Sequence, residues 1–184
     1  MAKKIKGKQW YTLVAPKMFD EKTLGETPVG DPESVMGRTI SIPLVNLIND
    51  PSKYYLKFHF KVKEREGEKA LTEFWGFECL RDYISRMIRH GVLRIDNVVD
   101  LKTKDNVKLR VKTIAVTSRK AKKEVEVSLR KFIKEKISEE VSKLTLEKLI
   151  KSVLDDSLKR SIIEEGSKIY PIYKFELRKV ERLD

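Results

Sequence analysis

The chain has 184 residues, enough for one domain with a sizeable hydrophobic core. Its 40 Lys and Arg against 28 Asp and Glu give a formal net charge of +12, which excludes an unstructured acidic tail. Such a balance favours an extended polyanion as partner, nucleic acid first and an anionic membrane second. Hydrophobic residues make up 40% of the chain, so a disordered basic tail is also excluded.

Several other classes are excluded by simple patterns. No run of 18 apolar residues occurs, so we expect no membrane-spanning helix. The basic start, Met1 to Lys8, leads into Gln9-Trp10 rather than an apolar run, so no secretory signal is expected. Cys79 is the single cysteine and can form neither an internal disulfide nor a zinc ribbon. These features predict a protein of the cytoplasm.

The first part of the chain reads mainly as strands. Residues 1–8 are expected to be a basic flexible arm, because four of the six positions from Lys3 to Lys8 are lysine. Alternating and β-branched patterns predict strands over residues 10–14, 40–44, 53–63 and 70–77, with an irregular loop over residues 25–32. The clearest alternation has one apolar face, made by Tyr54, Leu56, Phe58, Phe60 and Val62. We expect Trp75 and Phe77 to share a face of the returning strand, and Pro43 to mark an edge strand.

Helical spacing appears later. Residues 80–90 predict a helix that stops at Gly91, and two strands follow over residues 94–101 and 107–117. Asp105 and Asn106 suit a tight turn between these strands. Residues 118–165 predict three helices, the last stopped by Gly166, and residues 169–177 predict a final strand.

The order of elements predicts an α+β fold. A strand that returns after a helical segment can pair only with unpaired backbone of an existing sheet. We therefore expect an antiparallel β-barrel core over residues 9–117, completed by a C-terminal strand within residues 168–181. Helices from residues 118–165 would pack at one end, and residues 9–184 would form a single domain behind the arm.

Positive charge is concentrated outside the helical segment. Residues 1–123 hold 26 basic and 15 acidic side chains, whereas residues 124–165 hold 9 and 10. The densest run, residues 102–123, has nine basic side chains and only Asp105 as an acid. Lys108, Arg110 and Lys112 alternate and so share one strand face. This run is either a solvated face or, as we expect from its missing acids, a phosphate-binding surface.

Two further basic groups allow more than one interpretation. The arm beside Trp10 could place lysines on phosphates and an indole ring on an unstacked base, or Trp10 could be an ordinary core residue. Arg81, Arg86 and Arg89 share a helix face, where they could bind phosphate or pair with Glu78 and Asp82.

Catalytic patterns are missing from the sequence. His59 and His90 have no Cys, Asp or Glu at metal-ligand spacing, and no Gly-rich phosphate loop occurs. The carboxylate pairs Asp155-Asp156 and Glu164-Glu165 lie on amphipathic helices with lysines nearby. We therefore expect no enzyme, no metal and no cofactor.

Several motifs together resemble the S-three-ae (eS-one) family of small-subunit ribosomal proteins. They are spread from Lys8 to Val180, and their order and spacing carry the resemblance. The matching segments are Lys8-Gln9-Trp10-Tyr11, Ala15-Pro16-Lys17-Met18-Phe19, Gly25-Glu26-Thr27-Pro28, Val35-Met36-Gly37-Arg38, Leu80-Arg81-Asp82-Tyr83, Arg94-Ile95-Asp96, Val99-Asp100-Leu101-Lys102-Thr103-Lys104-Asp105 and Ile169-Tyr170-Pro171-Ile172. Because the chain ends soon after the last predicted strand, we expect an archaeal rather than a eukaryotic member.

The resemblance implies a structural, non-catalytic component of the small ribosomal subunit in translation. It implies binding to small-subunit rRNA on the platform near the mRNA exit, beside neighbouring ribosomal proteins and mRNA, with no membrane and no small-molecule substrate. The alternative is a free-standing single-stranded RNA-binding barrel module, and a third hypothesis is a nucleic-acid-processing enzyme. The predicted rRNA-binding residues are Lys3, Lys4, Lys6, Lys8, Trp10, Lys17, Arg38, Arg81, Arg86, Arg89, Arg94, Lys102, Lys104, Lys108, Arg110, Lys112, Arg119, Lys120, Lys122 and Lys123.

Overall fold

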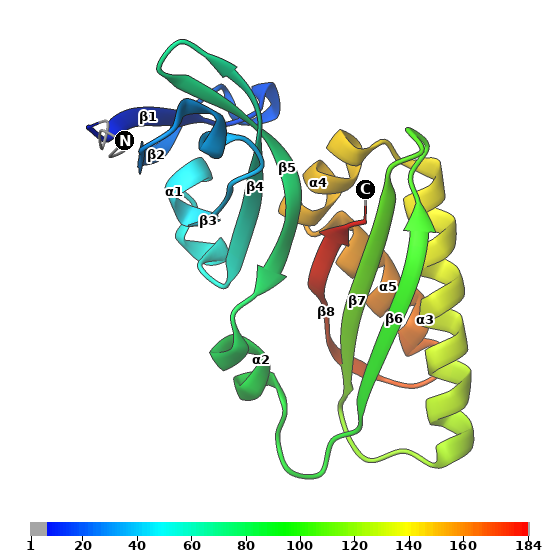
Figure 1. Ribbon diagram of the computed structural model, residues 1–184. Coiled ribbons are helices and arrows are strands. Elements are labelled where there is room, and N and C mark those ends of the chain that lie inside the picture. The colour runs from blue at the N-terminus through cyan, green and yellow to red at the C-terminus, as the bar shows by residue number, and fades with distance from the viewer. Residues whose placement is uncertain (1–6, 184) are drawn as a thin grey trace, which may run out of the picture. The chain divides into compact units, whose positions relative to one another are not determined.

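The computed structural model describes residues 7–183 and shows a mixed α+β protein (Figure 1). Backbone contacts divide the chain into two units, residues 1–77 and residues 78–184. Each unit contains strands and helices of its own, and the two are described separately below. In the described part of the chain, no helix combines the length and the apolar character needed to cross a membrane.

The first unit is built mainly from five strands. They are β1 (Gln9–Val14), β2 (Thr23–Val29), β3 (Thr39–Pro43), β4 (Leu56–Glu66) and β5 (Lys69–Cys79), whose last two residues belong to the second unit. Their order is β2-β1-β5-β4-β3, with β1 and β5 parallel. Short helical turns connect them: η1 (Lys17–Phe19), η2 (Pro32–Val35), α1 (Val45–Ile48) and η3 (Pro51–Lys53).

Aromatic rings fill the core of this unit. Every second residue of β4 from Leu56 to Val62 is buried, which confirms the predicted alternation within the strand. Phe58 stacks on Phe77 with ring centroids 5.4 Å apart, and Phe19 meets Phe58 edge to face at 5.8 Å. These contacts explain why β4 is the strand most clearly marked in the sequence.

Three details of the first unit differ from the predictions. Residues 23–29 form the edge strand β2 instead of a loop, because Pro28 needs no N–H partner at an edge. Strand β4 begins only at Leu56, and in the preceding turn Tyr54 is exposed while Tyr55 is buried. On β5, Phe77 packs in the core, whereas Trp75 lies only half-buried under the Lys61 ammonium, 3.8 Å from its ring centroid.

The second unit is a three-stranded antiparallel sheet covered by helices. Its elements are α2 (Arg81–Met87), β6 (Arg94–Lys102), β7 (Lys108–Thr117), α3 (Lys123–Lys143), α4 (Leu146–Leu154), α5 (Ser157–Ser167) and β8 (Ile172–Arg182). Strand β7 lies between β6 and β8, and the long helices cover one sheet face (Figure 1). Helix α3 buries Leu129, Ile133, Ile137 and Val141, one residue per turn.

Gly166 does not stop its helix as predicted. Helix α5 continues to Ser167, and Gly166 is buried within it. A Cβ atom at this position would lie 2.5 Å from Ile172 Cδ1 and 3.3 Å from Phe132 Cε1. A side chain here would force Ile172 to shift, because α5 packs closely against both neighbours.

The predicted barrel is not confirmed, although the α+β class is. Among the described strands, β2, β3 and β6 each pair with a single neighbour, so the sheet is open. The prediction of a returning strand is confirmed, because β8 pairs antiparallel with β7. Alternation predicts strands but carries no information about closure. The single-domain boundary at residues 9–184 stays a prediction.

Candidate nucleic-acid interface

The sheet face of the second unit that is not covered by α3, α4 and α5 carries charged side chains. Residues that lie directly opposite on neighbouring strands share a face. Across β6 and β7 these pairs include Asp100 with Arg110 and Lys102 with Lys108, and across β7 and β8 they include Lys112 with Lys179.

Two of the predicted cations on this face already have carboxylate partners. Arg110 donates to both carboxylate oxygens of Asp100 at 2.7 Å, and this bonding lowers the pKa of Asp100 and raises the pKa of Arg110. Lys112 lies 2.9 Å from Glu181. Although burial opposes it, hydrogen bonds from Lys179 and Lys112 lower the pKa of Glu181. The acids that the segment 102–123 lacks are supplied by β6 and β8.

Other predicted cations have no such partner. Lys102 and Lys108 are exposed and lie opposite each other, and neither makes an ion pair within residues 7–183. Lys104 is likewise exposed in the turn after β6. Like charges placed directly across two strands repel, so this pair favours an anion between the two ammonium groups.

The loop between β7 and α3, together with the first residue of α3, holds a second group of cations. Arg119, Lys120, Lys122 and Lys123 are exposed, and none makes an ion pair with a carboxylate in the described part of the chain. The loop is fixed by its backbone: Ser118 N–H donates to the Pro171 carbonyl at 3.0 Å, and Tyr170 Oη donates to the Lys120 carbonyl at 2.8 Å. These cations therefore project from an ordered segment.

Helix α2 carries Arg81 and Arg86, and Arg89 lies in the segment after it, because the helix ends at Met87 rather than at residue 90. All three arginines are exposed. The helix is anchored from its other side. Tyr83 Oη donates to Glu176 on β8 at 2.8 Å, and Glu176 lies 2.6 Å from Lys159 on α5, with both charged groups buried.

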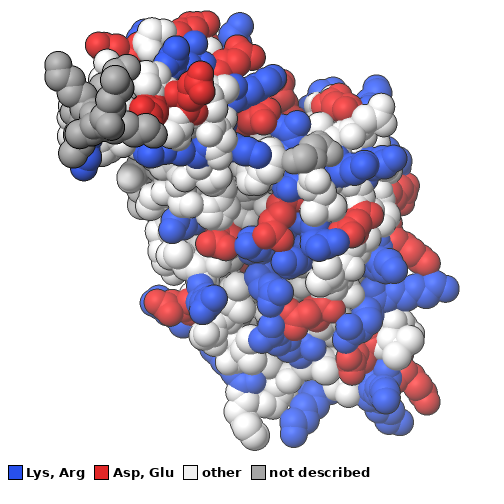
Figure 2. Space-filling view, viewed as in Figure 1, with Lys and Arg blue, Asp and Glu red and all other residues white. Residues whose placement is uncertain are grey.

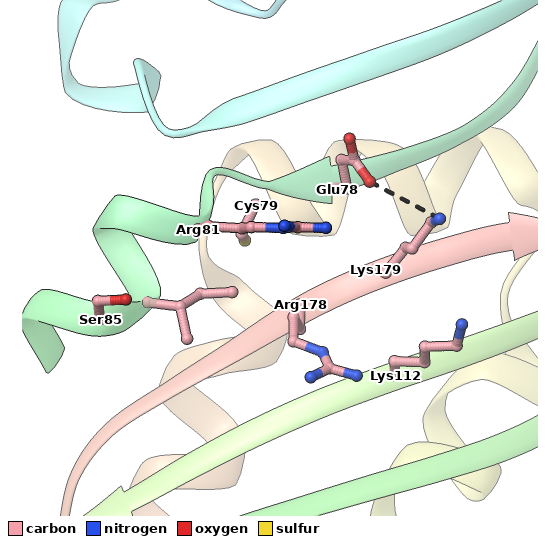
Figure 3. Close-up of a pocket in the computed structure, with 8 residues that line it drawn as sticks. Glu78, Cys79, Arg81, Ser85, Lys112, Arg178 and Lys179 are labelled. Atoms are coloured by element: carbon pink, nitrogen blue, oxygen red, sulfur yellow. Dashed lines mark ion pairs between the residues drawn. The ribbon is translucent and has the colours of Figure 1, made fainter. Parts of the chain in front are cut away.

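A cation-lined pocket of about 460 Å³ lies between α2 and the charged sheet face. Figure 3 shows Arg81, Lys112, Arg178 and Lys179 around it, with Glu78 3.7 Å from Lys179. Such a lining suits an anionic oxygen group. In the part of the chain that the structure describes, no group of three or more His, Cys, Asp or Glu could hold a metal ion.

The other predicted residues serve different roles. Trp10 is 60% exposed, so the interpretation as a core residue is wrong, and it lines a second pocket with Arg65. Arg38 donates to Thr27 Oγ1 and to the carbonyls of Ser34 and Pro28, which fixes local structure. Arg94 donates to both oxygens of Asp96. Lys8 and Lys17 are exposed, and the predicted Lys3, Lys4 and Lys6 lie outside the described residues.

The sequence analysis did not include one exposed aromatic residue of β8 among the predicted RNA-binding residues. Tyr173 is 46% exposed, and the Lys174 ammonium lies 5.8 Å from its ring centroid. The signal was weak: Tyr173 lies in a predicted strand, where an aromatic residue more often indicates core.

The described residues therefore define a basic α+β protein with unpaired cations on ordered segments, which is the class of polyanion-binding proteins. The model of the Ribosomal S3Ae family matches residues 1–184, and the chain belongs to this family. The resemblance found in the sequence is thereby confirmed.

Curated relatives from archaea match almost the whole chain. A protein of Methanopyrus kandleri named "Small ribosomal subunit protein eS1" is 39% identical, over 98% of this chain and 88% of the relative. Proteins of the same name from Saccharolobus islandicus and Desulfurococcus amylolyticus are 37% and 36% identical, each over 98% of this chain and over 86% and 84% of the relative.

Proposed function

We propose that this chain is a structural, non-catalytic constituent of the small ribosomal subunit in the cytoplasm and acts in translation. The observation that carries the proposal is its family membership, with relatives named "Small ribosomal subunit protein eS1" matching 98% of the chain. The unpaired cations on ordered segments support RNA as the ligand, because the phosphate backbone dominates affinity for nucleic acids.

The proposed rRNA contacts centre on the second unit. Lys102, Lys108 and the cations of residues 118–123 would bind phosphates, together with the exposed Arg81 and Arg86 of α2 and Arg89 after it. The predicted arm and Trp10 would add contacts from the first unit. The charges of α3 pair with one another instead, as in Glu126 with Arg130 and Lys136 with Glu140. We therefore assign the helical segment to core and protein–protein contacts.

The position within the subunit is proposed on the family resemblance. It implies the platform near the mRNA exit, beside the rRNA 3′ end, neighbouring ribosomal proteins and mRNA. A position on RNA at a subunit surface fits a chain whose basic side chains are unevenly distributed.

Sedimentation of a lysate tests the proposal. The native chain should migrate stoichiometrically with the small subunit, and a variant with Lys102, Lys108, Lys122 and Lys123 changed to Gln should move partly to the free fraction. A matched variant with Lys131, Lys134, Lys148 and Lys151 changed to Gln removes the same charge from helices α3 and α4 and should stay with the subunit. A native chain found only as a free low-mass peak would favour the alternative of a free-standing RNA-binding module.

A further inference from the structure

We infer that three loops at one end of the second unit form a stacking site for an unpaired base of single-stranded RNA, with Tyr173 as the platform. The inference rests on the proposed RNA-binding function and adds the form of RNA that this surface selects. These segments are residues 88–93, residues 118–123 with the first residue of α3, and residues 168–174 with the start of β8, and together they carry seven Lys and Arg and no Asp or Glu.

A β-bulge exposes the Tyr173 ring. Ile172 pairs with Thr117 and Lys174 pairs with Val116, so Tyr173 is the extra residue between two consecutive positions of β7. Bulges bend a strand and redirect a side chain. The ring is left 46% exposed, while its neighbour Ile172 is buried.

Two cations lie over the ring. The Arg89 guanidinium carbon is 5.9 Å from the ring centroid, and the Lys174 ammonium is 5.8 Å from it. Both distances are near the outer limit of cation–π attraction, which places the charged groups against the ring face. A base stacked on Tyr173 would thus have its flanking phosphates near positive charge.

Backbone hydrogen bonds hold the three loops together. Thr117 N–H donates to the Leu93 carbonyl at 3.0 Å, and Ser118 N–H donates to the Pro171 carbonyl at 3.0 Å. Thr117 Oγ1 donates to the Arg119 carbonyl at 2.6 Å. The connections from α2 to β6 and from β7 to α3 lie at the same end of the unit in Figure 1, and Figure 2 shows Lys and Arg side chains spread over this view with Asp and Glu among them.

These observations favour single-stranded RNA over a duplex. A-form duplex phosphates could use the cations but would leave the exposed ring without a partner, since paired bases are stacked inside the helix. A single strand uses both features, because any unpaired base offers a π-face and each nucleotide brings a phosphate.

The test uses the full chain and a single-stranded oligoadenylate about ten nucleotides long, the length scale of such sites. Loss of a stacking ring weakens binding measurably, so Tyr173→Ala should bind roughly tenfold more weakly, while Tyr173→Phe should bind like the native chain. Tyr54→Ala removes a tyrosine of similar exposure, 47%, from the first unit and is the matched control. Thermal melting checks that each variant folds.

Salt titration separates the ring from the charges. Tyr173→Ala should leave the salt dependence unchanged, whereas Lys122→Gln with Lys123→Gln should reduce the slope of log K against log salt by about 1.4. Two results would overturn the stacking site and leave the proposed function intact. In one, Tyr173→Ala binds duplex RNA and oligoadenylate more weakly by the same factor. In the other, Tyr173→Ala binds oligoadenylate with native affinity. Failure of the native chain to bind both oligoadenylate and small-subunit rRNA would instead overturn the proposed function.

Discussion

The buried ion pair between Lys159 and Glu176 joins the helical layer to β8. Their charged groups are 2.6 Å apart, and Glu176 also accepts the Tyr83 hydroxyl hydrogen bond from α2. Lys159 has a second carboxylate, Asp156, at 2.9 Å. Two helices, α2 and α5, are therefore joined to β8 through one glutamate.

Removing that glutamate charge should destabilise the protein. In Glu176→Gln the Lys159 ammonium keeps only Asp156, so we expect the free energy of unfolding to fall by about 3 kcal/mol. Urea denaturation measures the change. Glu165→Gln, which breaks a solvent-accessible pair with Lys136, is the control and should lower the free energy of unfolding much less. Equal losses of unfolding free energy in the two variants would show that the buried pair stabilises the protein no more than the accessible pair does.

The Cys79 thiol should be unreactive in the folded protein. Burial, followed by the nearby Glu176 charge, raises its pKa from 9.0 to about 12. The folded state thus favours the protonated thiol, and this stabilisation is complete below pH 9.0 and is lost as the pH rises toward about 12. Alkylation by iodoacetamide at pH 8 should therefore require unfolding by urea. Rapid alkylation of the folded chain would contradict the assignment.

A helix or strand feature can be predicted from the sequence when it depends only on residues close together in the chain. The alternation of β4 was readable because its faces differ so strongly, with Phe58 buried and Lys63 exposed. The bulges in β8 could not be predicted from the sequence, because the extra residues Tyr173 and Arg178 are defined only by the register of β8 against β7. For the same reason the sequence alone did not place Asp100 beside Arg110, ten residues away.

The pairing across β6, β7 and β8 predicts which charges contribute to RNA binding. Lys102→Gln with Lys108→Gln should reduce the slope of log K against log salt by about 1.4 to 1.8, because both ammonium groups are unpaired. The matched variant Asp100→Asn with Arg110→Gln removes a whole ion pair on the same strands and should leave the slope nearly unchanged. Filter binding to a small-subunit rRNA fragment at several salt concentrations measures both slopes. A larger change of slope in the Asp100→Asn, Arg110→Gln variant than in the Lys102→Gln, Lys108→Gln variant would show that Arg110 leaves Asp100 to bind a phosphate.

Across the whole molecule, contacts should follow the distribution of charge. Residues 1–123 hold a surplus of basic side chains, whereas residues 124–165 hold 9 basic and 10 acidic ones. Ultraviolet crosslinking in intact small subunits should therefore link rRNA mainly to residues 1–123 and to the β8 region. Peptide mapping by mass spectrometry reads the sites. Crosslinks concentrated in residues 124–165 would contradict the division of roles.

The repulsion between Lys102 and Lys108 links the stability of the fold to the binding of an anion at these two lysines. Two like charges held directly opposite each other destabilise the unbound sheet, and an anion that neutralises them removes that cost. A ligand that binds only the folded state also raises its stability by mass action. The chain should therefore melt at a lower temperature alone than on RNA, so that the copies most exposed to unfolding and degradation are those without a ribosomal partner.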